Sequence, residues 1–574
     1  MRKVLIGTLS ALALATAAFV VYSRPRHPGL TAVRPVTDSM LLAADSGGDW
    51  LTYGRGFANQ RFAPFTQIDR ETVQHLRPLW HQGTRRLIKS YLRTESTPVV
   101  ADGMLIYTDP GMRVAEPGNH VIAVDLRTGR EIWSWYHDPG RTALCCGLVN
   151  RGVALYGDKV YVATLDAHLV ALDRRTGKMV WDRKVENAEP NEGYSFTMAP
   201  LAAGGKIIIG TSGGEFRIRG FVDAYDPETG RRLWRFYTIP SPEEGGWWGR
   251  LSLTTPEGTP LPRDTAEERR DSAAYADTWK LGGGPVWTTP AYDPALGLIF
   301  LGIGNPSGVD GRIPPGDNLY TSSLAALDLA SGKLRWYYQM VPHNEWDYDP
   351  ASPPVLLDVP HGGATIPAVA QAGKTGWVHI LDRRTGKLLR RSEPFVPQQH
   401  IFTAPTAEGL RIAPGTRGGS NWPSAAYSPR TGALYVLGSH IPMLYKIDSA
   451  AMAEAGARKP TAPPHVLATF TEFKNDGRFG TITAVDAATG RIRWQHKVKS
   501  PLMVGGALAT ASGLVFFTDP PALTALDAET GKLVWRYEVD KGVIGPPITF
   551  MVDGQQRVAV TSTRGVTVFG LQEN

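Results

Sequence analysis

A short sequence phrase occurs seven times along this 574-residue chain, and it limits the possible folds more than any other feature. In each copy, apolar residues precede an Asp, two variable residues lead to Thr-Gly or Ser-Gly, and an aromatic residue usually follows. The copies end at Trp133, Trp181, Trp234, Trp336, Arg390, Trp494 and Trp535. A repeat of fixed period with an aromatic anchor predicts a closed or stacked array of similar units.

Each copy has the pattern of a strand, a tight turn and a second strand. The Asp carboxylate can accept hydrogen bonds from backbone N–H groups of the turn, and Gly supplies the positive φ that the turn requires. Successive anchors are 48 residues apart from Trp133 to Trp181 and 53 apart from Trp181 to Trp234. Units of about 50 residues with four short strands are typical of β-propeller blades. We predict that each closing Trp packs against a neighbouring blade.

Two gaps between anchors, after Trp234 and after Arg390, are about twice as long as the others. We interpret each gap as a degenerate copy plus an insertion, and residues 427–432 are the candidate for a degenerate turn. Counting Trp80 and the degenerate unit, we predict an all-β fold: an eight-bladed β-propeller with tryptophan-docked blades.

The N-terminal residues have the composition of an export segment. A basic start, Met1-Arg-Lys, precedes an apolar stretch that ends near Tyr22. Such a segment is typical of a secretory signal, and its length approaches that of a membrane anchor. We therefore predict a periplasmic protein, either free or anchored in the inner membrane. We divide the chain into a signal peptide or anchor at 1–25, a linker at 26–47 and a propeller at 48–574, with insertions at about 240–283 and 447–478.

The insertion at 240–283 is rich in Pro, Gly and charged residues and has no strand pattern. Insertions of this length in a compact domain are usually functional or flexible. We expect this one to wall the entrance to the functional site.

The charge pattern excludes one class of partner. Charged residues make up 20% of the chain and the net charge is +7, but Lys and Arg are scattered through turns without a basic run. Nucleic-acid binding is therefore not predicted. We interpret the surplus charge as a solvated basic surface, the alternative being attraction for an acidic protein partner.

The only two cysteines, Cys145 and Cys146, are adjacent. In an oxidising compartment two such thiols can close on each other. Adjacent Cα atoms lie about 3.8 Å apart, below the usual disulfide range, so the ring would be strained, and such strain is typical of functional sites. The alternatives are a metal-binding pair and two free thiols.

Several segments resemble those of the quinoprotein alcohol dehydrogenases, which use pyrroloquinoline quinone (PQQ). Cys145-Cys-Gly-Leu-Val-Asn-Arg151 is similar to the vicinal-cysteine segment of that family. The other matching segments follow in chain order at residues 50–62, 95–100, 213–220, 302–306, 344–349, 374–376 and 505–510. The resemblance implies an eight-bladed propeller that oxidises primary alcohols, aldehydes or sugars in the periplasm, with PQQ and a metal ion on its axis.

The resemblance also implies which residues hold the cofactor. Cys145 and Cys146 would form a disulfide plate over one face of the quinone, and Trp287 would stack on the other face. Lys374 would stand beside the reactive quinone oxygens and stabilise charge that arises on reduction. Without the resemblance, Trp287 is another blade-docking Trp and Lys374 and Arg151 are surface charges. The remaining implied contacts to PQQ come from Glu95, Arg151, Thr197, Gly213, Gly214 and Asn421.

The implied metal ligands are oxygen donors, which suit a hard cation. Asp347 is also the implied general base: it would take the hydroxyl proton of the substrate while hydride passes to C5 of the quinone and the metal acts as a Lewis acid. Asp349 resembles the lanthanide-dependent branch but also occurs in glucose-type relatives, so Ca²⁺ and a lanthanide both stay open. The alternative is a set of ordinary loop residues. The ligands are Glu215, Asn305, Asp347 and Asp349.

The resemblance leaves the substrate and the electron acceptor open. The sequence has no Cys-x-x-Cys-His motif and therefore no covalently attached haem, so electrons would pass to a cytochrome c or a membrane quinone. Val504 replaces a Trp that is common in alcohol-oxidising members, and residues 366–384 look nearer to membrane glucose dehydrogenases. An alcohol is the expected substrate. The alternatives are a PQQ-dependent aldose or polyol dehydrogenase and a non-catalytic propeller scaffold of the cell envelope.

Overall fold

The regular structure is almost entirely β-strand, which confirms the all-β prediction. The computed structural model describes residues 33–83, 95–109, 118–140, 142–144, 146–189, 192–307, 314–447, 468–473, 477–539 and 545–572. Its helices are short: α1 (Asp38–Leu42), α2 (Thr265–Asp271) and the 3-10 turns η1 (Thr72–His75), η3 (Gly214–Phe216), η4 (Pro242–Glu244), η5 (Ser272–Tyr275) and η6 (Thr278–Leu281).

Five antiparallel sheets each consist of four consecutive strands. They are β3 (Val99–Ala101) to β6 (Glu131–His137) through β4 (Met104–Asp109) and β5 (Asn119–Asp125); β7 (Ala154–Tyr156), β8 (Lys159–Ala163), β9 (His168–Asp173) and β10 (Met179–Lys184); β11 (Leu201–Ala203), β12 (Lys206–Gly210), β13 (Phe221–Tyr225) and β14 (Arg232–Tyr237); β15 (Ala291–Asp293), β16 (Leu298–Ile303), β17 (Ser323–Asp328) and β18 (Leu334–Gln339); and β19 (Val355–His361), β20 (Ala364–Ala372), β21 (Val378–Asp382) and β22 (Leu388–Arg391).

Three further sheets complete this series. They are β24 (Ala426–Ser428), β25 (Ala433–His440), β28 (Phe479–Asp486) and β29 (Ile492–Val498); β30 (Ala507–Thr510), β31 (Leu514–Asp519), β32 (Ala522–Asp527) and β33 (Leu533–Glu538), with β1 (Phe62–Ala63) added in parallel; and β34 (Ile548–Val552), β35 (Gln555–Ser562) and β36 (Gly565–Leu571) with β2 (Leu76–Gly83). A separate three-stranded sheet holds β23 (Leu410–Ile412), β26 (Met443–Ile447) and β27 (Ala468–Glu472).

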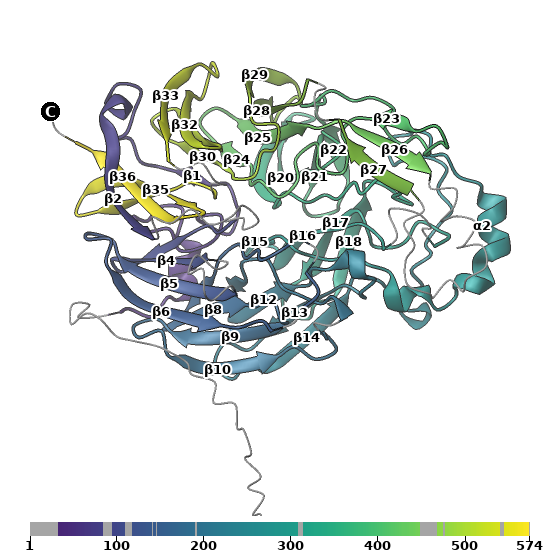
Figure 1. Ribbon diagram of the computed structural model, residues 1–574, viewed down its shortest axis with the longest axis horizontal. Helices are drawn as coiled ribbons and strands as arrows, with labels where there is room; N and C mark the ends of the chain where they lie inside the picture. The colour runs from purple at the N-terminus through teal and green to yellow at the C-terminus, as the bar shows by residue number, and fades with distance from the viewer. Residues whose placement is uncertain are drawn as a thin grey trace, which may run out of the picture.

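The sheets follow one another in chain order around a common centre (Figure 1). The ring closes where β2, from the N-terminal part, pairs with β36 at the C-terminus, so that Leu76 lies opposite Leu571. The described residues thus hold eight sheets of four or more strands, and we interpret each as one blade. Inner strands are buried on both faces, as in β4, whereas the outer strand β18 alternates between half-buried and exposed residues. Neighbouring sheets therefore pack face to face.

Six of the described tryptophans pack against the neighbouring sheet, as predicted, and each of them contacts the turn of the next repeat. Trp133 on β6 stacks on Gly177, where an added Cβ would lie 2.6 Å from the indole ring. Its Nε1–H donates to the carbonyl of Arg174, directly after Asp173, at 2.8 Å. The same pairing of ring and glycine joins Trp80 to Gly129, Trp181 to Gly230, Trp234 to Gly332, Trp336 to Gly386 and Trp494 to Gly531. In each of these pairs Nε1 donates to the residue after the Asp, at 3.0 to 3.2 Å.

The turns themselves have the predicted chemistry. The Asp125 carboxylate accepts the backbone N–H and the hydroxyl of Thr128, both at 2.8 Å, and Gly129 has a φ of 68°. The interpretation of residues 427–432 is wrong, however. This turn joins the first two strands of its sheet, β24 and β25, whereas the repeat copy of the same sheet is the turn before Trp494. Each long gap therefore holds one sheet with insertions and no additional degenerate repeat.

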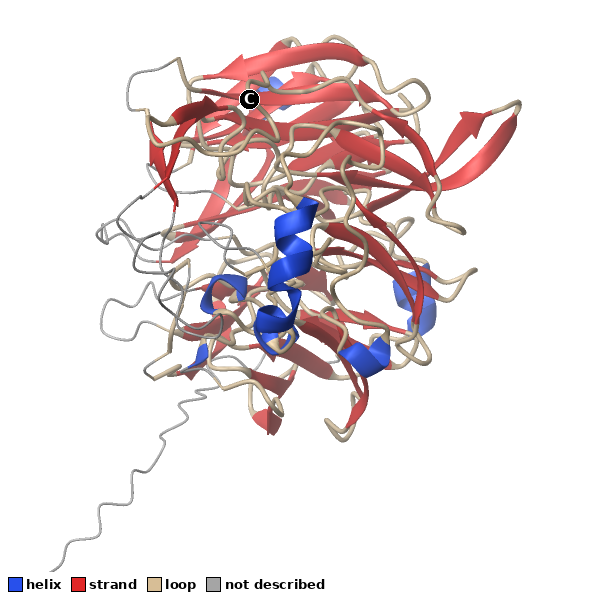
Figure 2. Ribbon diagram, turned by 90° about the vertical axis from the view of Figure 1, so that its right-hand side faces the viewer, coloured by secondary structure: helices blue, strands red, loops and turns tan. Residues whose placement is uncertain are grey.

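Residues 240–283 contain α2 and the three 3-10 turns η4, η5 and η6, and α2 lies at the outer edge of the ring (Figures 1 and 2). Glu257 from this insertion reaches two sheets, because its Oε1 lies 2.5 Å from the Tyr338 hydroxyl and 3.2 Å from His379 Nε2. Hydrogen bonds and the charge of His379 lower the pKa of Glu257 to about 2, although burial opposes this shift. The insertion is therefore fastened across neighbouring blades.

The described N-terminal residues also pack on the ring. Within the predicted linker, Val36 forms a β-bridge with Gly157, and Asp102 binds both Arg34 and Arg174 at 2.8 Å. No helix in the described ranges is long and apolar enough to cross a membrane. The predicted signal peptide or anchor, residues 1–25, lies outside those ranges, as does most of the second insertion, 447–478.

We predict that Trp133→Leu destabilises the ring by about 3 kcal/mol, because it removes buried aromatic area and leaves the Arg174 carbonyl without its donor. The midpoint of urea unfolding, followed by circular dichroism, measures this effect. Met179→Ala is the matched control on the adjacent sheet, since Met179 is 44% exposed. Equal midpoints for the two variants would contradict the role assigned to the indole.

Candidate active site at the centre of the ring

One cavity of about 540 Å³ gathers nearly all of the predicted site residues. It is lined by Glu95, Cys146, Arg151, Thr197, Gly213, Glu215, Trp287, Asn305, Asp347, Asp349, Lys374 and Asn421. Of the two predicted residues that are not in this set, Gly214 begins η3 between Gly213 and Glu215, and an added Cβ there would lie 2.9 Å from Pro285, which lines the cavity. Cys145 lies outside the described residues, so its predicted disulfide with Cys146 stays a prediction.

Arg151 organises one wall of the cavity. Its guanidinium forms a 2.6 Å ion pair with Glu95, and both side chains are at least 95% buried. It also donates to the Thr197 hydroxyl at 2.7 Å and to the Trp287 carbonyl at 3.1 Å, and it lies 4.8 Å from the centre of the Trp287 ring. The planar fork of an arginine can satisfy several acceptors at once. The four residues therefore form one fixed polar wall beside an aromatic plate.

Lys374, which also lines the cavity, stands between two carboxylates. Its Nζ lies 2.8 Å from Asp347 Oδ2 and 2.7 Å from Asp349 Oδ2. Asp349 Oδ1 in turn accepts the backbone N–H of Asn305 at 2.5 Å. Burial raises the pKa of Asp347, while the adjacent Lys374 ammonium lowers it and the carboxylate of Asp349 raises it. Burial lowers the pKa of Lys374, but the two aspartates raise it by more, so Lys374 stays protonated.

The residues present fit a polar aromatic cofactor and a hard cation. Asn421 Oδ1 and Arg151 Nε are buried atoms without a hydrogen-bond partner in the described part of the chain, as expected where a polar ligand completes the network. Gly304 lets the backbone approach Asp349, since an added Cβ would lie 3.1 Å from Asp349 Oδ1. Within that same part, no group of three or more His, Cys, Asp or Glu could hold an ion alone. The predicted cation would therefore need additional oxygen ligands, such as the Asn305 side chain.

Sequence reasoning missed some residues of the wall. Thr416, Arg417 and Trp422 line the cavity, and the Arg417 guanidinium forms a 2.6 Å ion pair with Glu472 on β27. Their proximity to the Gly-Gly-Ser-Asn421 segment was the available signal. None of the described lining residues comes from residues 240–283, so the expectation that this insertion walls the entrance stays a prediction.

The sequence profile of a known family covers most of the ring. The family described as PQQ, glucose/ethanol/alcohol dehydrogenase, beta-propeller domain, matches residues 50–401 and 396–558. The chain belongs to this family. It is therefore an oxidoreductase of the PQQ-dependent class that acts on CH–OH groups, as the resemblance implied.

Known proteins are similar in sequence to this chain over nearly its whole length. Quinoprotein alcohol dehydrogenase PedH of Pseudomonas putida is 34% identical over 95% of this chain and 93% of its own. Quinohemoprotein alcohol dehydrogenase ADH IIB of P. putida is 36% identical over 98% of this chain and 79% of its own. Among solved structures, a europium-containing methanol dehydrogenase superposes with a TM-score of 0.76 at 31% identity, covering 92% of both chains. The quinohemoprotein alcohol dehydrogenase of Comamonas testosteroni superposes with a TM-score of 0.78 at 29% identity, covering 94% of this chain and 83% of that one.

Proposed function

We propose that this PQQ-dependent dehydrogenase oxidises an alcohol in the periplasm and passes the electrons to a cytochrome c or a membrane quinone. The observation that carries the proposal is the single cavity that unites the polar wall of Arg151 and Glu95, the Trp287 plate, and the Asp347, Asp349 and Lys374 cluster. A propeller that served only as an envelope scaffold would not need this combination of buried charges in its centre.

The side chains divide the work of the reaction. When bound, PQQ supplies a hydride acceptor and the cation supplies Lewis-acid polarisation. Asp347 takes the hydroxyl proton of the substrate, and its Oδ2 is oriented by Lys374 at 2.8 Å. Lys374 remains protonated and stabilises negative charge that develops beside it. Arg151, held by Glu95, binds a carboxylate of the cofactor, and Trp287 orients the flat ring.

Glu215, Asn305, Asp347 and Asp349 hold the cation in this proposal. Calcium and a lanthanide both suit all-oxygen ligands, and a second aspartate favours the ion of higher charge. The similarity to a europium-containing methanol dehydrogenase over 92% of the chain supports testing a lanthanide first.

Export and the electron acceptor follow from the sequence. The basic and apolar segment before Tyr22 supports transfer to the periplasm. Electrons must leave the protein by an external carrier or one that this sequence does not encode, because it has no Cys-x-x-Cys-His motif for a covalent haem. An aldose or polyol would use the same machinery and is distinguished from an alcohol by the substrate panel below.

Reconstitution tests the function and the base together. Apoprotein supplied with PQQ and either Ca²⁺ or La³⁺ should reduce a dye with primary alcohols faster than with aldoses. Asp347→Asn should bind PQQ within about 3-fold of wild type but lose at least about 100-fold in kcat, since the proton acceptor is removed. Asp358→Asn is the control, because Asp358 is 61% exposed on β19. Undiminished turnover by Asp347→Asn would exclude it as the base, and an inactive wild type would refute the proposed activity.

Asp349→Asn should separate the two cations. The amide keeps an oxygen for the Asn305 N–H but removes the charge that favours a trivalent ion. We expect kcat with La³⁺ to fall at least about 10-fold, while kcat with Ca²⁺ stays within about 3-fold. Steady-state dye reduction at saturating cation measures both values. Equal losses with the two cations would assign Asp349 a structural role toward Lys374.

A further inference from the structure

The loop that carries Asp347 has an unusual backbone. His343 and Asp347 have φ values of 50° and 60°, in the left-handed region that glycine favours, although neither is glycine. Each such residue costs on the order of 1–3 kcal/mol and persists only where its surroundings fix it. The position of the proposed base therefore depends on what holds this loop.

The side chains of Asn344 and Trp346 fix the middle of the loop. Asn344 is fully buried, and its side-chain oxygen accepts the backbone N–H groups of Trp346 at 3.0 Å and Tyr348 at 3.1 Å. Its Nδ2 donates to the Ser322 hydroxyl at 2.9 Å, and the Trp346 indole donates to the Thr403 carbonyl at 2.9 Å. These bonds leave the start of the loop, at His343, to be held by something else.

His343 is held by the segment of residues 316–319. Its Nδ1 lies 2.9 Å from the Gly316 carbonyl oxygen, and its backbone N–H donates to the Asp317 carbonyl at 3.3 Å. Its Nε2 lies 3.4 Å from a Glu345 carboxylate oxygen. The histidine is 7% exposed, so these partners replace solvent around it.

Residues 316–319 are in turn held by the insertion at 240–283. The Gly316 N–H donates to Glu268 on α2 at 2.8 Å. The backbone N–H groups of Asp317 and Asn318 donate to the Trp248 carbonyl at 2.5 and 3.3 Å, and that of Leu319 donates to the Trp247 carbonyl at 2.5 Å. Four successive backbone N–H groups thus donate hydrogen bonds to residues of the insertion.

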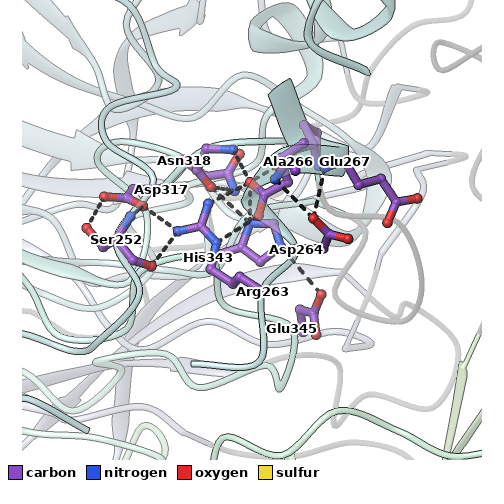
Figure 3. A network of polar contacts seen from close by, with 12 residues as sticks. Ser252, Arg263, Asp264, Ala266, Glu267, Asp317, Asn318, His343 and Glu345 are labelled. Carbon is purple, nitrogen blue, oxygen red and sulfur yellow. Dashed lines mark hydrogen bonds and ion pairs between the residues drawn. The ribbon is translucent and has the colours of Figure 1, made fainter. Parts of the chain in front are cut away.

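Arg263 joins the parts of the insertion that make these contacts (Figure 3). Its Nε and Nη2 bind both oxygens of Glu268 at 2.9 and 2.6 Å, and its Nη1 donates to Asp317 at 2.6 Å and to the Ser252 carbonyl at 2.9 Å. The Arg263 side chain is 1% exposed and Asp317 is 4% exposed. Asp317 also accepts the Ser252 N–H at 2.9 Å and hydroxyl at 2.5 Å.

We infer that Arg263 is a positioning residue for Asp347, a role that rests on the proposed function of Asp347 as the base. A buried ion network costs desolvation and often contributes little net stability, so its value lies in fixing one arrangement. Here Arg263 holds Glu268 and Asp317. Glu268 accepts the Gly316 N–H, and the carbonyl groups of residues 316 and 317 hold His343 at the start of the strained loop. The insertion acts as an external brace for the catalytic loop.

Hydrogen–deuterium exchange on the apoprotein tests this inference without turnover. We compare wild type, Arg263→Met, Arg263→Lys and the control Arg269→Met, which alters an exposed arginine on α2. In Arg263→Met, backbone exchange at residues 342–349 should be at least about 10-fold faster, because the carboxylates of Glu268 and Asp317 lose their shared partner. Arg263→Lys keeps the charge but not the planar guanidinium, so its exchange rate at residues 342–349 should lie between those of wild type and Arg263→Met. The exchange rate of Arg269→Met should equal that of wild type.

The pattern of exchange separates a brace from a local structural role. Faster exchange in residues 248–268 alone, with 342–349 unchanged, would overturn the inference. If Arg263→Met does not fold, Arg263→Lys is judged by the same criterion.

The kinetic arm uses reconstituted holoenzyme. Arg263→Met should lose about 10- to 100-fold in kcat, while KM and the Kd for PQQ stay within about 3-fold, because the base moves and the Arg151 wall does not. An unchanged kcat would overturn the inference. If wild type shows no turnover, the proposed function fails, and the exchange experiment still decides whether Arg263 holds the loop.

Discussion

The structure depends on the docking of a tryptophan on the Asp-x-x-Thr-Gly turn of the next repeat. Each contact joins an indole ring to a glycine and an indole N–H to a backbone carbonyl, so it fixes both the distance and the rotation between two sheets. Repeated around a ring that β2 and β36 close, this contact directs the inner loops of many sheets to one centre. Residues as distant in sequence as Glu95 and Asn421 consequently share a single cavity.

The cavity combines charges that would be costly to bury singly. The ion pair of Arg151 with Glu95 is internally balanced, whereas Lys374 faces two aspartates, whose charges exceed its own when both are ionised. Glu215, which lines the same cavity, adds a further carboxylate. A hard cation would offset this excess and would also compensate the carboxylates of a quinone bound beside it. In our inference, the buried ion network of Arg263 likewise uses charge to fix a position, that of the loop that carries Asp347.

The repeat in the sequence was sufficient to predict the all-β ring and the docking tryptophans, because turn chemistry and aromatic anchors are local signals. The resemblance supplied the cavity residues, which no local pattern marks: Arg151 and Lys374 look like surface charges until the fold brings partners to them. One interpretation failed because it used local chemistry alone. The turn at 427–432 has local repeat chemistry but joins a different pair of strands. Which strands such a turn joins is decided by long-range packing, which a local sequence pattern does not show.

The most direct test of this account is the crystal structure of the protein soaked with PQQ and either Ca²⁺ or La³⁺. The account predicts density for a flat ring between Trp287 and the Cys145–Cys146 pair, with one of its carboxylates at Arg151 and an ion at Glu215, Asn305 and Asp347. An empty centre, or a ring bound elsewhere on the protein, would contradict it.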